Sequence, residues 1–492
     1  MSSRLIDLKP NKVFKYFEDI CDIPHGSRNT KAISDYCVEF AKEHHLKYIQ
    51  DDSNNVIIFK DSSLGFENHD TIIMQGHLDM VNEKTTNSLH DFEKDGLNLI
   101  IDGDSIHCKD TTLGADDGIA IAYVLAILDD NSLAHPPIEA VFTVDEEIGL
   151  LGASALDVTP LKGKSLINID SEEEGIFLAG CAGGVTADIT FPIDRINIKG
   201  ISYNLSITGL NGGHSGTEID KGYANAHKLL GRILYKFKSN DVYYGINNIS
   251  GGSKDNVIPN ICNVTLIIPN DEDNKALALQ TVKEINSEFK TEFQVADCNI
   301  EIKLEENNNG VEEEIDIMSM KSNVIITFFL MNAPNGIQYM NQSIKGLVET
   351  SLNMGILNSS KENINIGFSV RSSVKSAKHN LMDQLTYITE FLGGECNFKG
   401  DYPSWTYRST SKLRTVFTET YKELYGKEAK VETIHAGLEC GIFDEKFEKQ
   451  GKTLDIISFG PDMQNIHTTK ESLSISSVQR CWEFVIKILG EL

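Results

Sequence analysis

The sequence predicts an α/β protein in which a first domain, with a mixed central sheet flanked by helices, is interrupted by a second, α+β domain. Three observations predict this arrangement. The 492 residues exceed what one hydrophobic core usually serves. Short apolar runs separated by helical patterns fill the beginning of the chain and return near its end. Strands of alternating polarity begin near Gly184. We therefore expect the first domain over residues 1–190 and 395–492, and the inserted domain over residues 191–394.

The first domain begins with helical patterns and continues with apolar runs of the length of buried strands. Amphipathic periodicity predicts helices over residues 11–21, 30–44 and 119–128. Apolar runs predict strands at residues 55–59, 71–74, 138–142 and 165–169. Beyond the inserted domain, a strand at residues 454–458 and a helix from Ser476 would complete the same sheet and its helical cover.

The inserted domain shows strands with one solvated face. Residues 185–191 and 203–207 alternate between apolar and polar side chains, as strands of a half-exposed sheet do. Helices are predicted over residues 224–237 and 275–289, with a strand at 260–268 between them, and a similar succession resumes at Asn323. This domain is either a single α+β unit or two ferredoxin-like halves, and the residues do not match well enough to prove a repeat.

Composition excludes several classes of function. A net charge of −27 provides no basic surface for nucleic acid or anionic lipid. No apolar run has the length needed to cross a bilayer, and the first residues do not resemble a secretory signal. The nine cysteines are odd in number and scattered, which argues against a disulfide framework. We expect a cytoplasmic protein with no nucleic-acid or membrane partner.

His77 and Asp79 follow the strand predicted at residues 71–74. The carboxyl end of a strand is where α/β sheets place ligand sites. An imidazole that binds a metal usually gives its second ring proton to a carboxylate, so Asp79 is suitably placed to orient His77. Taken alone, a hydrogen-bonded surface pair explains this triplet better than a metal site does.

Asp116 lies just before the helix predicted at residues 119–128. A carboxylate in such a loop can span two cations with its two oxygens. An aspartate before a helix can equally be an N-cap that accepts hydrogen bonds from free backbone N–H groups. This segment by itself favours neither interpretation.

Two adjacent glutamates, Glu146 and Glu147, follow the strand at residues 138–142. Adjacent carboxylates allow a division of labour, because a general base has to stay unligated beside the metal. We interpret Glu146 as the base and Glu147 as a ligand. The alternative is an acidic first helical turn that the helix dipole favours.

Asp170 and His467 each follow a predicted strand, at residues 165–169 and 454–458. Read alone, His467 is an ordinary loop histidine. Read with the other segments, it completes two sites rich in oxygen and nitrogen ligands that share a carboxylate. Such a donor set suits zinc, manganese or cobalt.

The order His-x-Asp, Gly-Ala-Asp-Asp, Glu-Glu, Asp and His resembles the co-catalytic metallopeptidase family that includes glutamate carboxypeptidase, aminoacylase, peptidase T and carnosinase. The resemblance runs nearly from end to end. Within the family, the segments at residues 170–175, 181–184 and 435–441 are most similar to the bacterial aminoacyl-histidine dipeptidases.

The resemblance implies two divalent metal ions, zinc before manganese or cobalt. It places one ion on His77 and Asp170 and the other on Glu147 and His467, with Asp116 bridging them. It also implies a cis peptide bond between Asp116 and Asp117. Members with aspartate at the position of Asp170 tend to act on free amino termini, which favours a dipeptidase.

The resemblance further implies that the inserted domain is a lid that contributes to catalysis and substrate binding. Asp79 and Glu146 would be catalytic, and His214 would stabilise the oxyanion. The residues implied in substrate binding are Asn256, Arg371, Gly437 and Glu439. For Arg371, a surface ion pair remains an alternative.

The resemblance therefore implies an enzyme that hydrolyses dipeptides with a free amino terminus, including Xaa-His dipeptides, with a small peptide as its partner. The alternatives on the same metal centre are a tripeptidase or an N-acyl amino acid amidohydrolase. A non-catalytic peptide-binding protein is disfavoured because all five ligands and Glu146 are present. Both a monomer and a homodimer remain open, since a duplicated lid could supply His214 within one chain.

Overall fold

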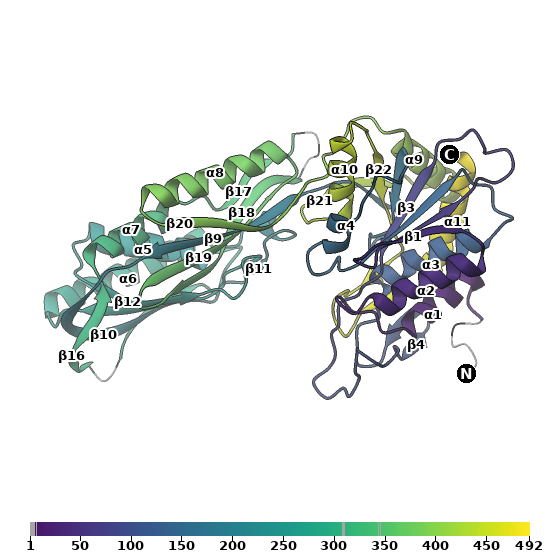
Figure 1. Ribbon diagram of the computed structural model, residues 1–492. Helices are drawn as coiled ribbons and strands as arrows, with labels where there is room; N and C mark the ends of the chain where they lie inside the picture. The colour runs from purple at the N-terminus through teal and green to yellow at the C-terminus, as the bar shows by residue number, and fades with distance from the viewer. Residues whose placement is uncertain (1–4, 6, 308–309, 343, 345) are drawn as a thin grey trace. The chain divides into compact units, whose positions relative to one another are not determined.

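The computed structural model describes residues 5, 7–307, 310–342, 344 and 346–492. The chain divides into two compact units (Figure 1). The first unit comprises Met1–Cys181, Trp405–Ile434 and Leu438–Leu492. The second comprises Ala182–Ser404 and His435–Gly437. An α/β fold with an inserted second unit, as the sequence predicts, is confirmed.

An eight-stranded mixed sheet forms the centre of the first unit. Its strand order is β1-β2-β6-β3-β7-β22-β8-β21. The bounds are β1 Lys47–Gln50, β2 Val56–Lys60, β6 Ile138–Thr143, β3 Ile72–His77, β7 Ser165–Asn168, β22 Asp455–Ser458, β8 Ile176–Cys181 and β21 Lys430–Ile434.

Four neighbouring strands of this sheet, β6, β3, β7 and β22, run parallel to one another. Their carboxyl ends therefore meet at one edge of the sheet. In register, His77 pairs with Thr143, and Asn168 pairs with both Gln75 and Ser458. Each of these strands is followed by one of the acidic or histidine segments singled out in the sequence. This shared edge explains why residues far apart in the chain can form one site.

Helices cover both faces of the sheet (Figure 1). On one face, Ile72 and Met74 of β3 join a core formed with α1, α2, α3, α9 and α11. Ile73, which alternates with them, is equally buried and faces the other side, where α4 and α10 pack against each other. The bounds are α1 Asn11–Cys21, α2 Lys31–Glu43, α3 Ala115–Asp129, α4 Leu151–Ala155, α9 Lys412–Tyr425, α10 Glu439–Lys449 and α11 Ile475–Glu491.

A small four-stranded sheet lies in the same unit, with the order β23-β24-β5-β4. Its strands β23 and β24 form an antiparallel hairpin, and the loop between them carries His467. The bounds are β23 Met463–Gln464, β24 Ser472–Ser474, β5 Ser105–Cys108 and β4 Leu99–Asp102.

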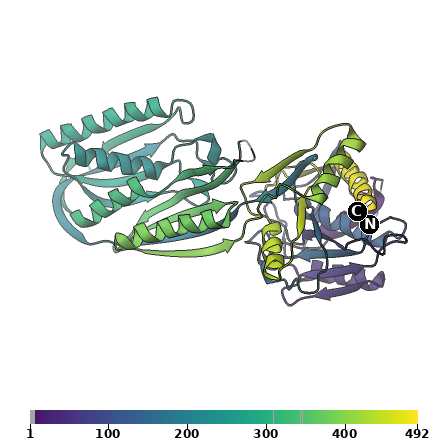
Figure 2. The ribbon, with the colours of Figure 1, turned by 90° about the horizontal axis from the view of Figure 1, so that it is seen from above.

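The second unit is built on a ten-stranded sheet with the path β15-β10-β14-β12-β18-β19-β9-β20, to which β16 and β17 are added on β10 and β18. Four helices lie on one face of this sheet (Figures 1 and 2). The strand bounds are β9 Gly183–Pro192, β10 Arg195–Thr208, β12 Gly245–Gly251, β14 Cys262–Ile268, β15 Glu301–Glu306, β16 Glu312–Met318, β17 Gly336–Met340, β18 Val348–Ser359, β19 Asn363–Ser372 and β20 Glu395–Tyr402. The helices are α5 Ala226–Ser239, α6 Glu272–Glu292, α7 Met320–Asn332 and α8 Lys375–Phe391, and a short pair of strands consists of β11 Gly213–His214 and β13 Val257–Ile258.

This sheet consists of two halves with the same β-α-β-β-α-β topology. One half is β10-α5-β12-β14-α6-β15 and the other is β9-α7-β18-β19-α8-β20, each with the fourth strand beside the first and the third beside the second. That is the ferredoxin-like arrangement. The halves join where Ser250 and Gly251 of β12 pair with Asn358 and Leu357 of β18. The halves are not consecutive in the chain, because β9 precedes the whole first half and α7 follows it.

The boundaries of the second unit differ from those expected at 190/191 and 394/395. They lie at 181/182 and 404/405, and the short segment His435–Gly437 also belongs to this unit. The reason is strand pairing, since β9 pairs along its length with β19 and is also paired by β20. Both edge segments are therefore part of the second sheet.

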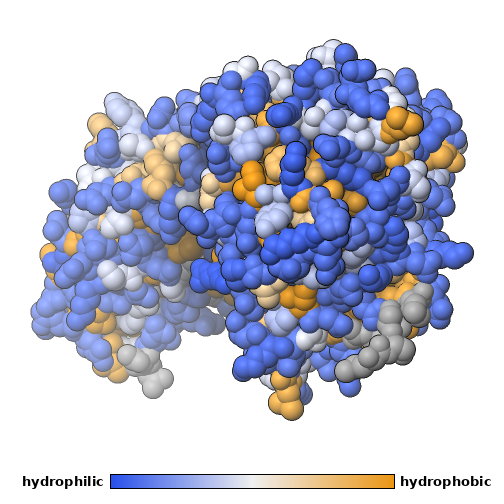
Figure 3. Space-filling model, turned by 45° about the vertical axis from the view of Figure 1, so that its right-hand side comes forward, coloured by the Kyte–Doolittle hydropathy of each residue, from blue (hydrophilic) through white to orange (hydrophobic). Residues whose placement is uncertain are grey.

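The hydrophilic surface of the protein agrees with its charged composition. The face drawn in Figure 3 is mainly hydrophilic, with hydrophobic residues in small scattered groups. Within the described residues, no helix combines the length and apolar character that a membrane crossing requires.

Candidate metal centre

Asp116 lies between two histidines, and each of its carboxylate oxygens faces a different one. Oδ1 lies 3.1 Å from Nε2 of His77, and Oδ2 lies 3.2 Å from Nε2 of His467. The two histidines come from the end of β3 and from the β23–β24 loop. A carboxylate in this position can serve two neighbouring sites at once.

The turn before α3 presents Asp116. Gly114 has a φ of 65°, a left-handed conformation that a glycine adopts without the steric cost of a Cβ. Asp116 and Asp117 have backbone angles outside the helical region, so regular helix begins only after them. The peptide bond between them is cis, as the family resemblance implied. The whole turn is buried.

His77 is held on three sides. Its backbone N–H donates to Oδ2 of Asp117 at 3.0 Å, and its ring Nδ1 lies 3.0 Å from the carbonyl oxygen of Asp79. The carboxylate of Asp79 is farther from Nδ1, at 3.6 Å. The ring is thus oriented mainly by the backbone of Asp79. Nε2, on the opposite side of the ring, faces Asp116.

Besides facing the ring of His77, the carboxylate of Asp79 accepts hydrogen bonds from two other segments. Its Oδ1 accepts the backbone N–H of Glu146 at 2.9 Å, and its Oδ2 accepts the hydroxyl of Ser27 at 2.8 Å. The N–H of Glu147 lies 3.4 Å from Oδ2. Asp79 therefore orders the loop that carries the two glutamates.

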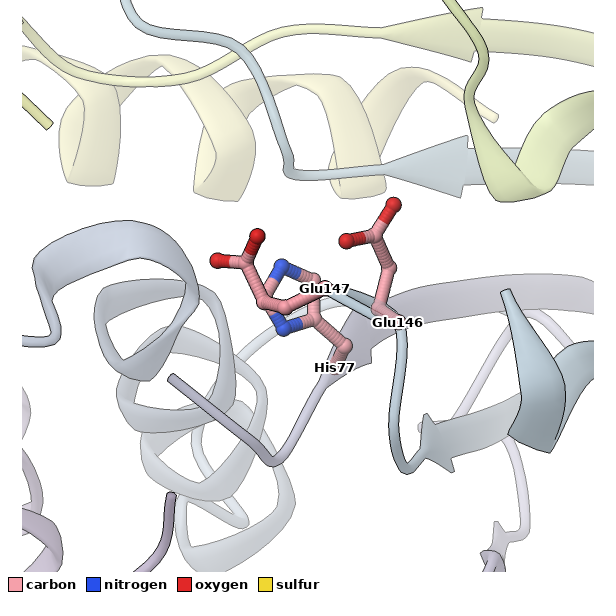
Figure 4. Close-up of side chains that lie close together, drawn as sticks. All are labelled: His77, Glu146 and Glu147. Carbon is pink, nitrogen blue, oxygen red and sulfur yellow. The ribbon is translucent and has the colours of Figure 1, made fainter. Parts of the chain in front are cut away.

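Glu146 and Glu147 extend from this loop toward His77 (Figure 4). One ligand atom from each of the three residues lies within 4.8 Å of the other two. Glu147 Oε1 is 2.9 Å from Nε2 of His467, whereas no hydrogen bond of the Glu146 carboxylate is found in the described part of the chain. The two neighbours thus differ in their surroundings, as the expected division of labour requires.

The charges at this site are strongly coupled. Burial lowers the pKa of His467, but its hydrogen bonds with Asp116 and Glu147 raise it to about 11. Burial raises the pKa of Asp116, but the hydrogen bonds from both histidines outweigh it and hold the pKa well below its usual range. Burial and neighbouring carboxylates raise the pKa of Glu146 and of Asp170 well above the ordinary value. So many acids in one buried place imply compensation by cations.

Three groups of side chains could each hold a metal ion, and two of them share Asp116. One of these two is His77, Asp116 and Asp170, and the other is Asp116, Glu147 and His467, each with ligand atoms within 4.8 Å of one another. Carboxylate oxygens and imidazole nitrogens are donors that suit divalent transition metals. The residues present therefore fit a dinuclear centre, and all five expected ligands are brought together.

Glu439 lies beneath this site and is fully buried. Its Oε2 accepts hydrogen bonds from Nε2 of Gln75 at 2.5 Å and from the hydroxyl of Thr143 at 2.6 Å. Its Oε1 has no partner among the described residues. Burial raises the pKa of Glu439 to about 7. A contact of Glu439 with substrate, which the resemblance implied, would have to be made through Oε1.

In the second unit, His214 lies on β11 opposite Val257 of β13. Its Nδ1 accepts the backbone N–H groups of Gly216, at 3.3 Å, and of Thr217, at 3.2 Å. With Nδ1 acting as an acceptor, the neutral ring carries its proton on Nε2. Burial and the charge of Arg371 lower the pKa of His214. His214 is thus a neutral donor through Nε2.

Arg371, on β19, is buried, and its Nη1 donates to the hydroxyl of Tyr402 at 3.1 Å. Its Nε has no hydrogen-bond partner in the part of the chain that is described. Gly437 packs against the ring of Tyr402 so closely that a Cβ there would lie 2.6 Å from it. The fourth expected residue, Asn256, accepts the N–H of Ser215 through its carbonyl oxygen.

Two residues of the site were missed by the sequence analysis, Ser27 and Asp117. Ser27 bonds to Asp79, and Asp117 receives the backbone N–H of His77. The turn at residues 23–28 was visible in the sequence, but nothing in it indicated a contact with residue 79. Asp117 was visible in the sequence as the second residue of an Asp-Asp pair, but a role was assigned only to the first residue, Asp116.

Comparison with known proteins places this geometry in a family. Residues 73–491 match the model of peptidase family M20/M25/M40. The chain belongs to this family. Its members are metal-dependent peptidases with a dinuclear site, which confirms the resemblance seen in the sequence. The chain is thus a metal-dependent hydrolase that acts on peptide bonds.

Individual relatives support this assignment over the full length. The chain is 34% identical over 493 residues to the cytosol non-specific dipeptidase of Escherichia coli K12, covering 100% of this chain and 99% of the relative. The crystal structure of aminoacylhistidine dipeptidase from Vibrio alginolyticus superposes with a TM-score of 0.91 at 34% identity, covering 100% and 98% of the two chains. A tripeptidase from Staphylococcus aureus shares the fold, with a TM-score of 0.55 at 15% identity over 98% of each chain.

Proposed function

We propose that this chain is a dipeptidase that hydrolyses the peptide bond of dipeptides with a free amino terminus, including Xaa-His dipeptides. The observation that carries the proposal is the position of Asp116, whose two oxygens face His77 and His467, with Glu146 beside them. The proposed ligands are His77, Asp116, Glu147, Asp170 and His467. Zinc is the proposed metal, with manganese and cobalt as alternatives that the same donors suit.

Two divalent ions held by these residues would polarise the scissile carbonyl and acidify a water molecule. Glu146 is the proposed general base, because its carboxylate lies within the cluster while Glu147 is engaged with His467. It would take the proton of the attacking water and return it to the leaving amine. Asp79 would keep Glu146 in place through its backbone N–H.

His214 and Arg371 are the proposed contacts of the substrate in the second unit. His214 has a ring N–H at Nε2 that can stabilise an oxyanion. Arg371 has a buried Nε without a partner among the described residues, which suits a guanidinium that binds the carboxylate of a dipeptide. Asn256, Gly437 and Glu439 complete the proposed substrate-binding set.

The dipeptide, rather than a longer or an acylated substrate, is favoured by two relatives that are 34% identical to this chain over its full length. One is named a non-specific dipeptidase and the other an aminoacylhistidine dipeptidase. A tripeptidase remains the alternative, and the tripeptidase with the same fold shows only that the fold permits it. An N-acyl amino acid amidohydrolase is a further alternative on the same centre.

A substrate panel tests the proposal. Zinc-, manganese- and cobalt-loaded enzyme is assayed with Ala-His, β-alanyl-histidine, Gly-Gly-Gly and N-acetyl-alanine. Cleavage of Ala-His that is lost in Glu146→Ala, with the metal content of the variant unchanged, is the expected result. Exclusive cleavage of Gly-Gly-Gly or of N-acetyl-alanine would replace the dipeptidase assignment. If Glu146→Ala kept the full activity of the wild type, Glu146 would not be the general base.

A further inference from the structure

Glu471 accepts hydrogen bonds from four successive backbone N–H groups of the turn that carries Asp116. Its Oε2 accepts from Leu113 at 2.7 Å and from Gly114 at 3.1 Å. Its Oε1 accepts from Ala115 at 2.9 Å and from Asp116 itself at 3.4 Å. The side chain of Glu471 is buried, with 3% of the residue's surface exposed. One carboxylate thus satisfies a complete run of buried donors.

These four donors are not the free first turn of an ordinary helix. Asp116 and Asp117 depart from helical backbone angles, so the N–H groups before them belong to an irregular turn. A buried N–H group without a hydrogen-bond partner destabilises the fold. The shape of the turn therefore depends on an acceptor brought from elsewhere in the chain, and Glu471 is that acceptor.

Glu471 also belongs to the loop that carries His467. The loop joins β23 to β24, and Glu471 is its last residue before β24, which pairs with β5 and β23. The N–H of Glu471 donates to the carbonyl of Thr468, and the hydroxyl of Thr468 donates to the carbonyl of Asn465. His467 itself has a φ of 59°, which is an uncommon value for a residue other than glycine. The carboxylate thus ties this loop to the turn of Asp116.

We propose that Glu471 is a positioning residue of the dinuclear centre, which fixes the separation of Asp116 and His467 without touching a metal ion or the substrate. It sets the affinity of the site formed by Asp116, Glu147 and His467 more than that of the site formed by His77, Asp116 and Asp170. The reason is that His77 ends β3 and Asp170 lies just after β7 of the central sheet, whereas His467 lies in a loop anchored through Glu471. This inference rests on the proposed two-metal centre.

Metal binding measured without any peptide tests this role. Metal-free wild type and Glu471→Gln are titrated with Mn²⁺ by calorimetry, and electron paramagnetic resonance distinguishes a coupled pair of ions from a single ion. Glutamine has the size of glutamate but only one acceptor oxygen, and its amide N–H groups would face backbone donors. Wild type is expected to bind two ions. In Glu471→Gln the weaker ion is expected to lose about 10- to 100-fold in affinity, as for other groups that orient ligands, with the tighter ion changed little.

Glu139→Gln is the matched control. Glu139 is also buried, with 3% exposed, and its carboxylate accepts the backbone N–H groups of Lys162 and Gly163 at 2.9–3.0 Å. It lies on β6 near the end opposite Thr143, away from the ligands. Glu139→Gln should lower the melting temperature but bind both ions like the wild type. If both variants lost the same affinity for the second ion, Glu471 would contribute only to the overall stability of the protein, and the inference would be overturned.

A second variant covers the case in which Glu471→Gln does not fold. Glu471→Asp keeps the charge and both acceptors but is shorter by one methylene, so it is expected to bind the second ion with an affinity between those of wild type and Glu471→Gln. Unchanged affinity for both ions in either folded variant, or fewer than two ions in the wild type, would overturn the inference. A wild type that binds two ions but cleaves no dipeptide would contradict the proposed function and leave the role of Glu471 intact.

Discussion

The carboxylate of Asp79 and the backbone N–H of Glu146 are joined by a hydrogen bond of 2.9 Å. This bond links the segment after β3 to the loop after β6, which are neighbouring strands of the parallel part of the sheet. Because Asp79 also accepts from Ser27 and lies near the N–H of Glu147, one buried acid sets the path of the loop that carries both glutamates. The position of the proposed base therefore depends on Asp79.

Asp79→Asn should reduce turnover by about 10- to 100-fold, because an amide has only one oxygen to accept from the N–H of Glu146 and the hydroxyl of Ser27. Steady-state kinetics with Ala-His should show the loss mainly in kcat. Ser27→Ala is the matched control, since it removes only the second of these bonds and should cost much less. If Asp79→Asn lowered the metal content but not the kcat of the fully loaded enzyme, Asp79 would act on His77 instead.

Glu146→Gln should reduce kcat for dipeptides by about 10²- to 10⁴-fold, the usual contribution of a general base. Metal content should stay unchanged, because Glu146 is not one of the proposed ligands. The control is Glu173→Gln, an exposed acid in the segment after β7, which should behave like the wild type. A Glu146→Gln variant that lost a metal ion together with its activity would make Glu146 a ligand.

The sequence could indicate that several of the proposed ligands lie together, because His77, Glu147 and Asp170 lie at or after the carboxyl ends of strands, and neighbouring parallel strands end at one edge. His77 and Asp170 illustrate this, since β3 and β7 are adjacent in the sheet. What the sequence could not show is contacts between distant segments. Ser27 with Asp79, and Glu471 with the turn of Asp116, join residues whose spacing in the chain follows no periodicity.

The organisation of the second unit was predicted only in part, for a related reason. Two α+β halves were visible from the alternation of strands and helices. The sequence did not show that the first half is inserted between β9 and α7 of the second half. Whether β9 pairs with β19 or with a nearer strand depends on long-range contacts, which leave no local pattern in the sequence. The all-round apolar helix α7 follows the first half in sequence but belongs to the second half. The boundaries were misplaced for the same reason.

Gly437→Ala should raise the KM for dipeptides with a smaller effect on kcat. A Cβ at this position would lie 2.6 Å from the ring of Tyr402, which has to shift, and Tyr402 accepts a hydrogen bond from Arg371. Losing a hydrogen bond with a charged group costs about 1.5–3 kcal/mol, which corresponds to about a 10- to 100-fold rise in KM. Tyr402→Phe should produce the same change without adding bulk. Gly490→Ala, where a Cβ meets nothing within 4 Å, is the neutral control. If KM were unchanged in both Gly437→Ala and Tyr402→Phe, Arg371 would not bind the substrate.

Metal binding should release protons, and metal affinity should rise with pH. The pKa of His467 is about 11 in the metal-free chain, so this imidazole is protonated at pH 7 and has to lose its proton before it can bind a metal. Asp116, whose pKa is lowered, is already ionised and releases none. Asp170, whose pKa is raised by burial, adds to the release. The affinity should therefore increase about tenfold per pH unit for each proton released, below the pKa of the group concerned.

Calorimetric titration in buffers of different ionisation heat, at one pH, counts the protons directly. At pH 7 at least one proton should be released when both metal ions bind. His467→Asn should release fewer, because the protonated ring is gone, whereas His69→Asn should match the wild type, since the His69 ring bonds to the carboxyl-terminal residue of the chain and not to a ligand. A protonated ring at His467 makes the metal ion and the proton compete for the same nitrogen, so the metal affinity has to change with pH. A metal affinity that stayed constant between pH 6 and 8 would therefore mean that the hydrogen bonds with Asp116 and Glu147 do not keep the ring of His467 protonated.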